Sequence, residues 1–129
     1  MWPGDRVRWL NMRRMPTERD LSESYPPVLL HELPLRAGTH WSENEALTAG
    51  DVRCSYGDLG QMVCNLASGL MQMGLARGSR VAVFLEKRIE AVVGSFGVTA
   101  AGGVLVPVNP LLKPAQVVHI LQDAGVAVL

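Results

Sequence analysis

The sequence has very few cysteines, which excludes two classes of small protein. Only 2 of the 129 residues are cysteine. Cys54 and Cys64 are too few for a disulfide scaffold, and their spacing matches no metal site. Their apolar neighbours predict two buried thiols in a reducing compartment, so we expect a cytoplasmic protein.

The chain also has no excess of charge of either sign. Twelve basic and twelve acidic residues give a formal net charge of zero, which argues against binding to a nucleic acid or to a membrane surface. The uncharged stretch 91–112 is long enough to span a bilayer. However, six of its residues are Gly or Pro, and these divide it into a helix and a strand. We therefore predict no membrane span.

Catalytic and cofactor motifs are missing as well. The strand predicted to end at Leu85 is followed by the charged run 86–88, and not by the glycines that let a backbone approach a pyrophosphate. This disfavours a nucleotide-binding oxidoreductase. Neither His31 nor His40 has a partner at metal-ligand spacing, and no nucleophile or carboxylate pair stands out. We therefore assign no catalytic, cofactor-binding or metal-binding residue.

The charged residues around position 87 are the polar cluster that a sheet would place nearest to a ligand. Lys87 and Arg88 follow a strand and precede a helix, and ligands of open α/β sheets bind at the carboxyl ends of strands. They are candidate ligand neighbours, although a solvated helix end is the simpler interpretation. Glu86 and Glu90 are expected to pair with nearby cations.

What the sequence does contain is a regular alternation of apolar segments after residue 80. Short β-rich runs alternate with segments of helical spacing, and glycines mark the helix ends. The predicted elements are a strand at 81–85, a helix from 89 that ends at Gly102-Gly103, a strand at 104–106, a helix from Pro114 to Gly125 and a strand at 126–129.

This alternation predicts the α/β class, with a parallel-sheet layer that has helices on both faces. The last strand ends at Leu129 with no helix after it. We therefore expect a partial, truncated N-terminal domain of a longer protein. An unpaired sheet edge would favour self-association.

The earlier part of the chain divides near residue 28. Residues 1–27 contain five arginines and four prolines, and we expect a loosely ordered basic leader without the apolar core of a secretory signal. Residues 28–129 form the predicted domain. Its first element is a short helix over 28–39, which Pro34 distorts and Gly38 ends, with an apolar face of Leu29, Leu30, Leu33 and Ala37. A hairpin over 46–54 follows. The next helix is capped by Ser55 and Asp58 and ends at Gly74, and its apolar stripe consists of Leu59, Met62, Val63, Leu66, Leu70 and Met73.

Three blocks of this sequence match known motifs in their usual order. Residues 54–59, CSYGDL, match (L/C)-(S/T)-Y-x-(E/D)-L. Residues 75–83, LARGSRVAV, resemble G-(x)-x-G-D-R-V-A-V, with Ser79 where Asp is usual. Residues 99–110, TAAGGVLVPVNP, match x-x-A-G-(G/A)-x-x-V-P-(L/V)-(N/D)-P. Over residues 28–129 the chain thus resembles the adenylate-forming superfamily, which comprises AMP-dependent acyl-CoA synthetases and adenylation domains.

The resemblance implies a fragment of an ATP-dependent, AMP-forming ligase. Such enzymes activate a small carboxylic acid as an acyl-adenylate and transfer it to a thiol such as CoA, with Mg accompanying the ATP. The family's phosphate loop, adenine motif, ribose-binding Asp and catalytic Lys match nothing in this sequence. By resemblance, the remainder of the ligase chain is the expected partner, and the 129-residue chain alone is expected to be inactive.

Three alternatives stay open. Asn109-Pro110 resembles fatty or aryl acyl-CoA ligases. The sequences of residues 85–90 and 107–114 are similar to those of the AMP-forming acyl ligases found beside exosortase systems. Asp in place of Asn109 would be commoner in the amino-acid-activating adenylation domains of peptide synthetases. A non-catalytic α/β binding module is the third alternative. The motifs leave the acyl substrate and the thiol acceptor open.

Overall fold

The computed structural model describes residues 29–129. The predicted leader, residues 1–27, lies outside this range. The elements in chain order are α2 (Glu32–His40), β1 (Glu45–Ala49), β2 (Val52–Ser55), α3 (Tyr56–Gln72), β3 (Arg80–Val83), α4 (Ile89–Ala100), β4 (Val104–Pro107), α5 (Pro114–Asp123) and β5 (Val126–Val128).

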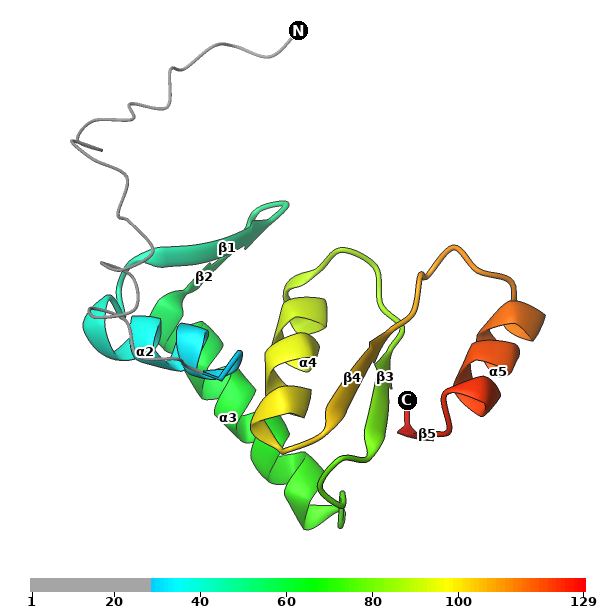
Figure 1. Ribbon diagram of the computed structural model, residues 1–129. Helices are drawn as coiled ribbons and strands as arrows, with labels where there is room; N and C mark the ends of the chain where they lie inside the picture. The colour runs from blue at the N-terminus through cyan, green and yellow to red at the C-terminus, as the bar shows by residue number, and fades with distance from the viewer. Residues whose placement is uncertain (1–28) are drawn as a thin grey trace, which may run out of the picture.

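A three-stranded parallel sheet confirms the predicted α/β class. The strand order is β4-β3-β5, so the central strand β3 pairs on both of its edges. Figure 1 shows α3 and α4 on one side of this sheet and α5 on the other. Two neighbouring residues of β3 lie on opposite faces of the sheet. Val81 packs in the core with α3 and α4, whereas Ala82 packs in the core with α5. Helices therefore cover both faces, as predicted.

The predicted limits of β3 are slightly wrong. The strand ends at Val83 and not at Leu85, because its parallel partner β4 ends opposite it at Pro107. Leu85 is 40% exposed in the loop that follows. The helix ends, in contrast, lie where the glycines predicted them, with positive φ angles of 77° at Gly102 and 58° at Gly125.

The prediction that Gly38 ends the first helix is wrong. α2 continues to His40, and Gly38 lies where a Cβ atom would come within 2.9 Å of the carbonyl oxygen of Tyr56. The glycine therefore permits close packing of α2 against α3 and does not cap the helix. Pro34 is buried in the first turn of α2, where its missing N–H leaves no hydrogen bond unmade, so it does not distort the helix.

The apolar face predicted for this first helix is also partly wrong. Leu29 and Leu30 precede α2 and, like Leu33, are more than half exposed. Leu35, on another face of the helix, packs against the core around Leu59 and Val63.

The hairpin and the helix after it agree with the sequence in most respects. β1 and β2 pair antiparallel around a turn with Gly50 at φ 59°, and Gly74 ends α3 with φ 85°. Two predictions fail here. Met73 lies beyond the helix and is 74% exposed, and Cys64 is exposed while Cys54 is buried. Burial, and secondarily the carboxylate of Asp58, raises the pKa of the Cys54 thiol.

Among the described helices, none combines the length and the apolar character required to cross a membrane. The uncharged stretch 91–112 is divided between α4, a turn and β4, as its glycines and prolines predicted.

α3 and α4 approach closely at Gly97. A Cβ atom at this position would lie 2.7 Å from Cδ2, 3.0 Å from Cγ and 3.1 Å from Cβ of Leu66. Because three atoms of the same side chain crowd the site, Leu66 cannot clear it by moving its tip alone.

We predict that Gly97→Ala destabilises the protein by about 1–3 kcal/mol, because it overpacks the contact between the two helices. Gly69→Ala is the matched control, since Gly69 is also helical and a Cβ there meets nothing within 4 Å. This control should stabilise the protein by up to about 1 kcal/mol. Urea unfolding measures both, and equal effects of the two substitutions would contradict the close approach.

Candidate functional site

The carboxyl ends of the parallel strands form the candidate functional edge of the molecule. The loop 84–88 follows β3 and the loop 108–113 follows β4. Figure 1 shows both loops and the tip of the β1-β2 hairpin at the same end of the molecule. β4 lies on one side of β3 and β5 on the other, so the order of connection reverses at β3. Open α/β sheets bind ligands in the crevice at such a reversal.

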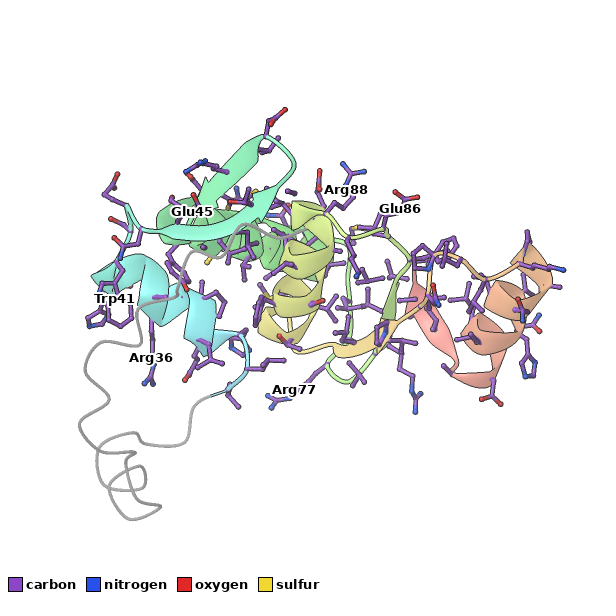
Figure 2. All side chains as sticks on the ribbon, turned by 90° about the horizontal axis from the view of Figure 1, so that it is seen from above. Arg36, Trp41, Glu45, Arg77, Glu86 and Arg88 are labelled. Carbon is purple, nitrogen blue, oxygen red and sulfur yellow. The ribbon has the colours of Figure 1, made fainter. Side chains whose placement is uncertain are left out.

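Charged side chains at the start of α4 occupy this edge. Figure 2 shows Glu86 and Arg88 projecting from the same edge of the ribbon, away from Arg77. The guanidinium of Arg88 donates two hydrogen bonds of 2.7 Å to the carboxylate of Glu90. This pairing lowers the pKa of Glu90 to about 2 and raises that of Arg88.

The expectation that Glu86 and Glu90 would pair with cations is thus met at Glu90. The ion pairs found within residues 29–129 join Glu32 to Arg36, Glu45 to Arg53 and Glu90 to Arg88. Neither Glu86 nor Lys87 takes part in them. Lys87 therefore makes no ion pair with an acid of the described residues.

Two adjacent hollows open beside this loop. The larger, here the charged cleft, has a volume of about 750 Å³ and lies between β2, α3 and the loop 86–90. Its charged lining residues are Arg53, Asp58, Glu86, Lys87, Arg88 and Glu90. The second, here the hairpin groove, has a volume of about 550 Å³ and runs between β1 and α4. Its apolar walls come from Leu47, Ala49, Ile89, Ala91, Val92 and Phe96.

The first sequence motif forms the junction between the hairpin and α3. The Ser55 hydroxyl accepts a hydrogen bond of 3.1 Å from the backbone N–H of Asp58, and the Asp58 carboxylate accepts one of 3.3 Å from the backbone N–H of Ser55. This reciprocal cap confirms the predicted start of the helix. The backbone N–H of Gly57 donates to the carbonyl of Ser42 at 2.9 Å, and a side chain at Gly57 would crowd that contact.

The second and third motifs meet each other at the opposite end of the sheet. Gly78 donates its backbone N–H to the carbonyl of Gly102 at 2.8 Å, and Val104 donates to the carbonyl of Ser79 at 2.9 Å. These bonds join the turn before β3 to the turn before β4 and set the register in which Arg80 faces Val104. All three motifs therefore hold backbone segments together.

The sequence profile of the family described as "AMP-binding enzyme" matches residues 35–129. This chain belongs to that family. The match begins within α2 and takes in every later element of the structure.

Curated relatives of this chain include a synthase and a CoA ligase. Tyrocidine synthase 2 of Brevibacillus parabrevis is 30% identical over 107 residues, which cover 83% of this chain and 3% of that protein. The long-chain-fatty-acid–CoA ligase of Bacillus subtilis is 30% identical over 125 residues, which cover 89% of this chain and 22% of that enzyme. The chain thus spans a small part of the length of these relatives.

Solved structures confirm the fold. VinN in complex with L-aspartate superposes with a TM-score of 0.75 at 27% identity, over 78% of this chain and 26% of VinN. The nonribosomal peptide synthetase FmoA3, in its AMPPNP-bound form, gives a TM-score of 0.75 at 29% identity over 78% of this chain and 11% of its own. The N-terminal subdomain of NpsA from Klebsiella oxytoca, at 23% identity and a TM-score of 0.70, has the same fold. It covers 75% of this chain and 26% of that chain.

No group of three or more His, Cys, Asp or Glu residues between 29 and 129 could hold a metal ion. Nδ1 of His40 lies 2.9 Å from the carbonyl oxygen of Arg36 at the end of α2. His31 precedes the same helix, so both histidines belong to a different segment of the chain from the loop 84–88. Sequence reasoning placed Lys87 and Arg88 at this edge, but it missed the hairpin as a wall of both hollows.

We expect the carboxyl pKa of Glu90 to be about 2 in an NMR titration. Arg88→Gln should return it toward 4.5, because the two hydrogen bonds that hold the anion are lost. Lys87→Gln, which removes the neighbouring unpaired cation, should leave it near 2.

The lowered pKa fixes the direction of a pH effect on stability. Since the folded value is below the unfolded one, the contribution of Glu90 is complete above about pH 4.5 and is lost as the pH falls toward 2. The difference in stability between the native protein and Glu90→Gln should therefore shrink over that range. A difference that grows on acidification would contradict the pairing.

We predict that Ser55→Ala lowers the free energy of unfolding by about 1 kcal/mol, because the backbone N–H of Asp58 loses its partner. Ser68→Ala serves as the control, since Ser68 is exposed within the same helix. Alanine is the better helix former there, so that substitution should be neutral or slightly stabilising. Denaturant unfolding distinguishes a lost cap from a general effect of removing a hydroxyl.

Proposed function

We propose that this chain is the structural part, near the N-terminus, of an ATP-dependent, AMP-forming ligase that activates a carboxylic acid and transfers the acyl group to a thiol. The observation that carries the proposal is the family match over residues 35–129. It is supported by the 30% identity to a long-chain-fatty-acid–CoA ligase over 89% of this chain. We place the activity in the cytoplasm.

The proposed reaction has two balanced steps. The acid's carboxylate attacks the α-phosphate of ATP to give acyl-adenylate and pyrophosphate, and the thiol then displaces AMP to give a thioester. The residues of this chain do not fit an ATP–Mg site, because the sequence has no phosphate loop and the described part has no carboxylate set for a metal. ATP, Mg and CoA would therefore be held by the remainder of the ligase.

The contribution of this chain is positional. The sheet and its glycine turns hold the loops 84–88 and 108–113 at one edge. Within the second loop, the Asn109 side chain accepts a hydrogen bond of 3.0 Å from the backbone N–H of Leu111, and this turn leads into α5. Rigid placement of such loops is what a bound nucleotide and acid require.

Amino-acid activation in a peptide synthetase is the second candidate function. The similarity to tyrocidine synthase 2 favours it, whereas Asn109 favours an acyl or aryl ligase, the exosortase-associated subgroup included. A non-catalytic binding module remains a third candidate.

The test is acid-dependent ATP–pyrophosphate exchange by the protein purified at its native length, with fatty acids, aryl acids and amino acids supplied separately. We expect exchange with fatty or aryl acids, and none from residues 1–129 expressed alone. Exchange with amino acids only would select the peptide synthetase. If the native-length protein catalyses no exchange with any of these acids, the non-catalytic binding module is the remaining candidate.

A further inference from the structure

Two hydrogen bonds of the loop 108–113 converge on one residue, Asn109. Its side-chain oxygen accepts a bond of 3.0 Å from the backbone N–H of Leu111, and its backbone carbonyl accepts one of 3.2 Å from the N–H of Leu112. Pro110 lies between them, has no N–H of its own and fixes a φ angle that suits the second position of a turn. Asn109 therefore accepts from both N–H groups that follow Pro110.

The bond to the side chain is the one that fixes the tip of this turn. Leu111 is 87% exposed, so its side chain packs against little of the described chain. Val108, before the turn, is 5% exposed, and Leu112, after it, packs against the core to which Val108 belongs. Because the turn bonds only residues 109–112 to one another, it can form whatever the rest of the protein places over it.

The turn also bears on the other loop of the candidate functional edge. Phe84, the first residue of the loop 84–88, packs against the same core as Leu112. The N–H of Val108 donates to the carbonyl of Val83, just before that loop, at 3.0 Å. The two loops thus share one support, which consists of Ala82, Val108 and Val117.

We propose that Asn109 is a positioning residue of this edge, that it acts through its side-chain oxygen, and that Asp can therefore replace it. The carboxylate of Asp carries an oxygen at the same distance from the backbone, and both residues are favoured at the first position of such turns. Gln holds its amide one methylene further out, and Ala has no acceptor. If Asn109 instead bound a ligand through its NH₂ group, Asp would be the most damaging of the three, because it lacks the donor and adds a negative charge.

Hydrogen exchange of the native-length protein, read at the Leu111 amide by mass spectrometry with residue-level fragmentation, measures the turn directly. We expect Asn109→Ala and Asn109→Gln to speed exchange of this amide about fivefold, the factor expected for one hydrogen bond. Asn109→Asp should keep the native rate of hydrogen exchange.

Asn65→Ala is the matched control. Asn65 lies on α3, on the other side of the sheet from α5 (Figure 1). Its amide oxygen accepts a bond of 2.9 Å from the side chain of Gln61. The substitution removes the same side chain without releasing the turn, so the Leu111 amide should exchange as it does in the native protein.

The same variants test the consequence for catalysis, which rests on the proposed function. Asn109→Ala and Asn109→Gln should lower kcat for ATP–pyrophosphate exchange about tenfold, because a misplaced loop costs rate even where no ligand contact is lost. Asn109→Asp should keep both the rate and the preferred acid, because the oxygen that it supplies bonds to the backbone.

The proposal is overturned if Asn109→Asp is as harmful as Asn109→Ala in either measurement. It is also overturned if Asn109→Ala leaves the Leu111 amide protected, or leaves kcat at the native value. If the native-length protein acts on none of the acids, the proposed function fails, while hydrogen exchange at Leu111 still decides whether Asn109 holds the loop.

Discussion

Burial of β3 on both faces is the constraint on which the rest of this structure depends. Val81 and Ala82 are each only 4% exposed, and they belong to separate cores. A strand covered in this way needs helices on both sides and a neighbour on each edge. α3 and α4 supply one face, α5 supplies the other, and β4 and β5 supply the edges.

The glycine turns explain how so short a sheet keeps its register. The bond from Gly78 to Gly102 and the bond from Val104 to Ser79 tie the entry of β3 to the entry of β4 before either strand begins. Gly78 and Gly102 both have positive φ angles, which other residues adopt only at a cost. The motif residues are thus required by backbone geometry, and they act at the end of the sheet opposite the candidate functional edge (Figure 1).

The elements after residue 80 could be predicted from the sequence because local signals agree there. The same boundaries are indicated by the spacing of the apolar residues, by the glycines at the helix ends and by the proline at the start of α5. The exceptions have long-range causes. The sequence predicts Gly38 as a helix end, yet a glycine is needed there because a Cβ atom would clash with the carbonyl oxygen of Tyr56, a residue 18 positions away in sequence. No pattern within α2 reveals that contact.

The candidate site was predictable to a similar extent. The charged run at 86–88 could be placed at a carboxyl edge from the strand-helix pattern alone, but the hairpin that forms the other wall of both hollows could not. Its approach to α4 depends on how α3 leaves the hairpin, through the cap formed by Ser55 and Asp58. The packing of segments that are distant in sequence has no periodic signal of its own.

The two kinds of relative show what this part of the fold does not determine. Tyrocidine synthase 2 and a long-chain-fatty-acid–CoA ligase are each 30% identical to this chain, although their names describe different products. Equal identity to both agrees with motifs that fix turns and helix caps.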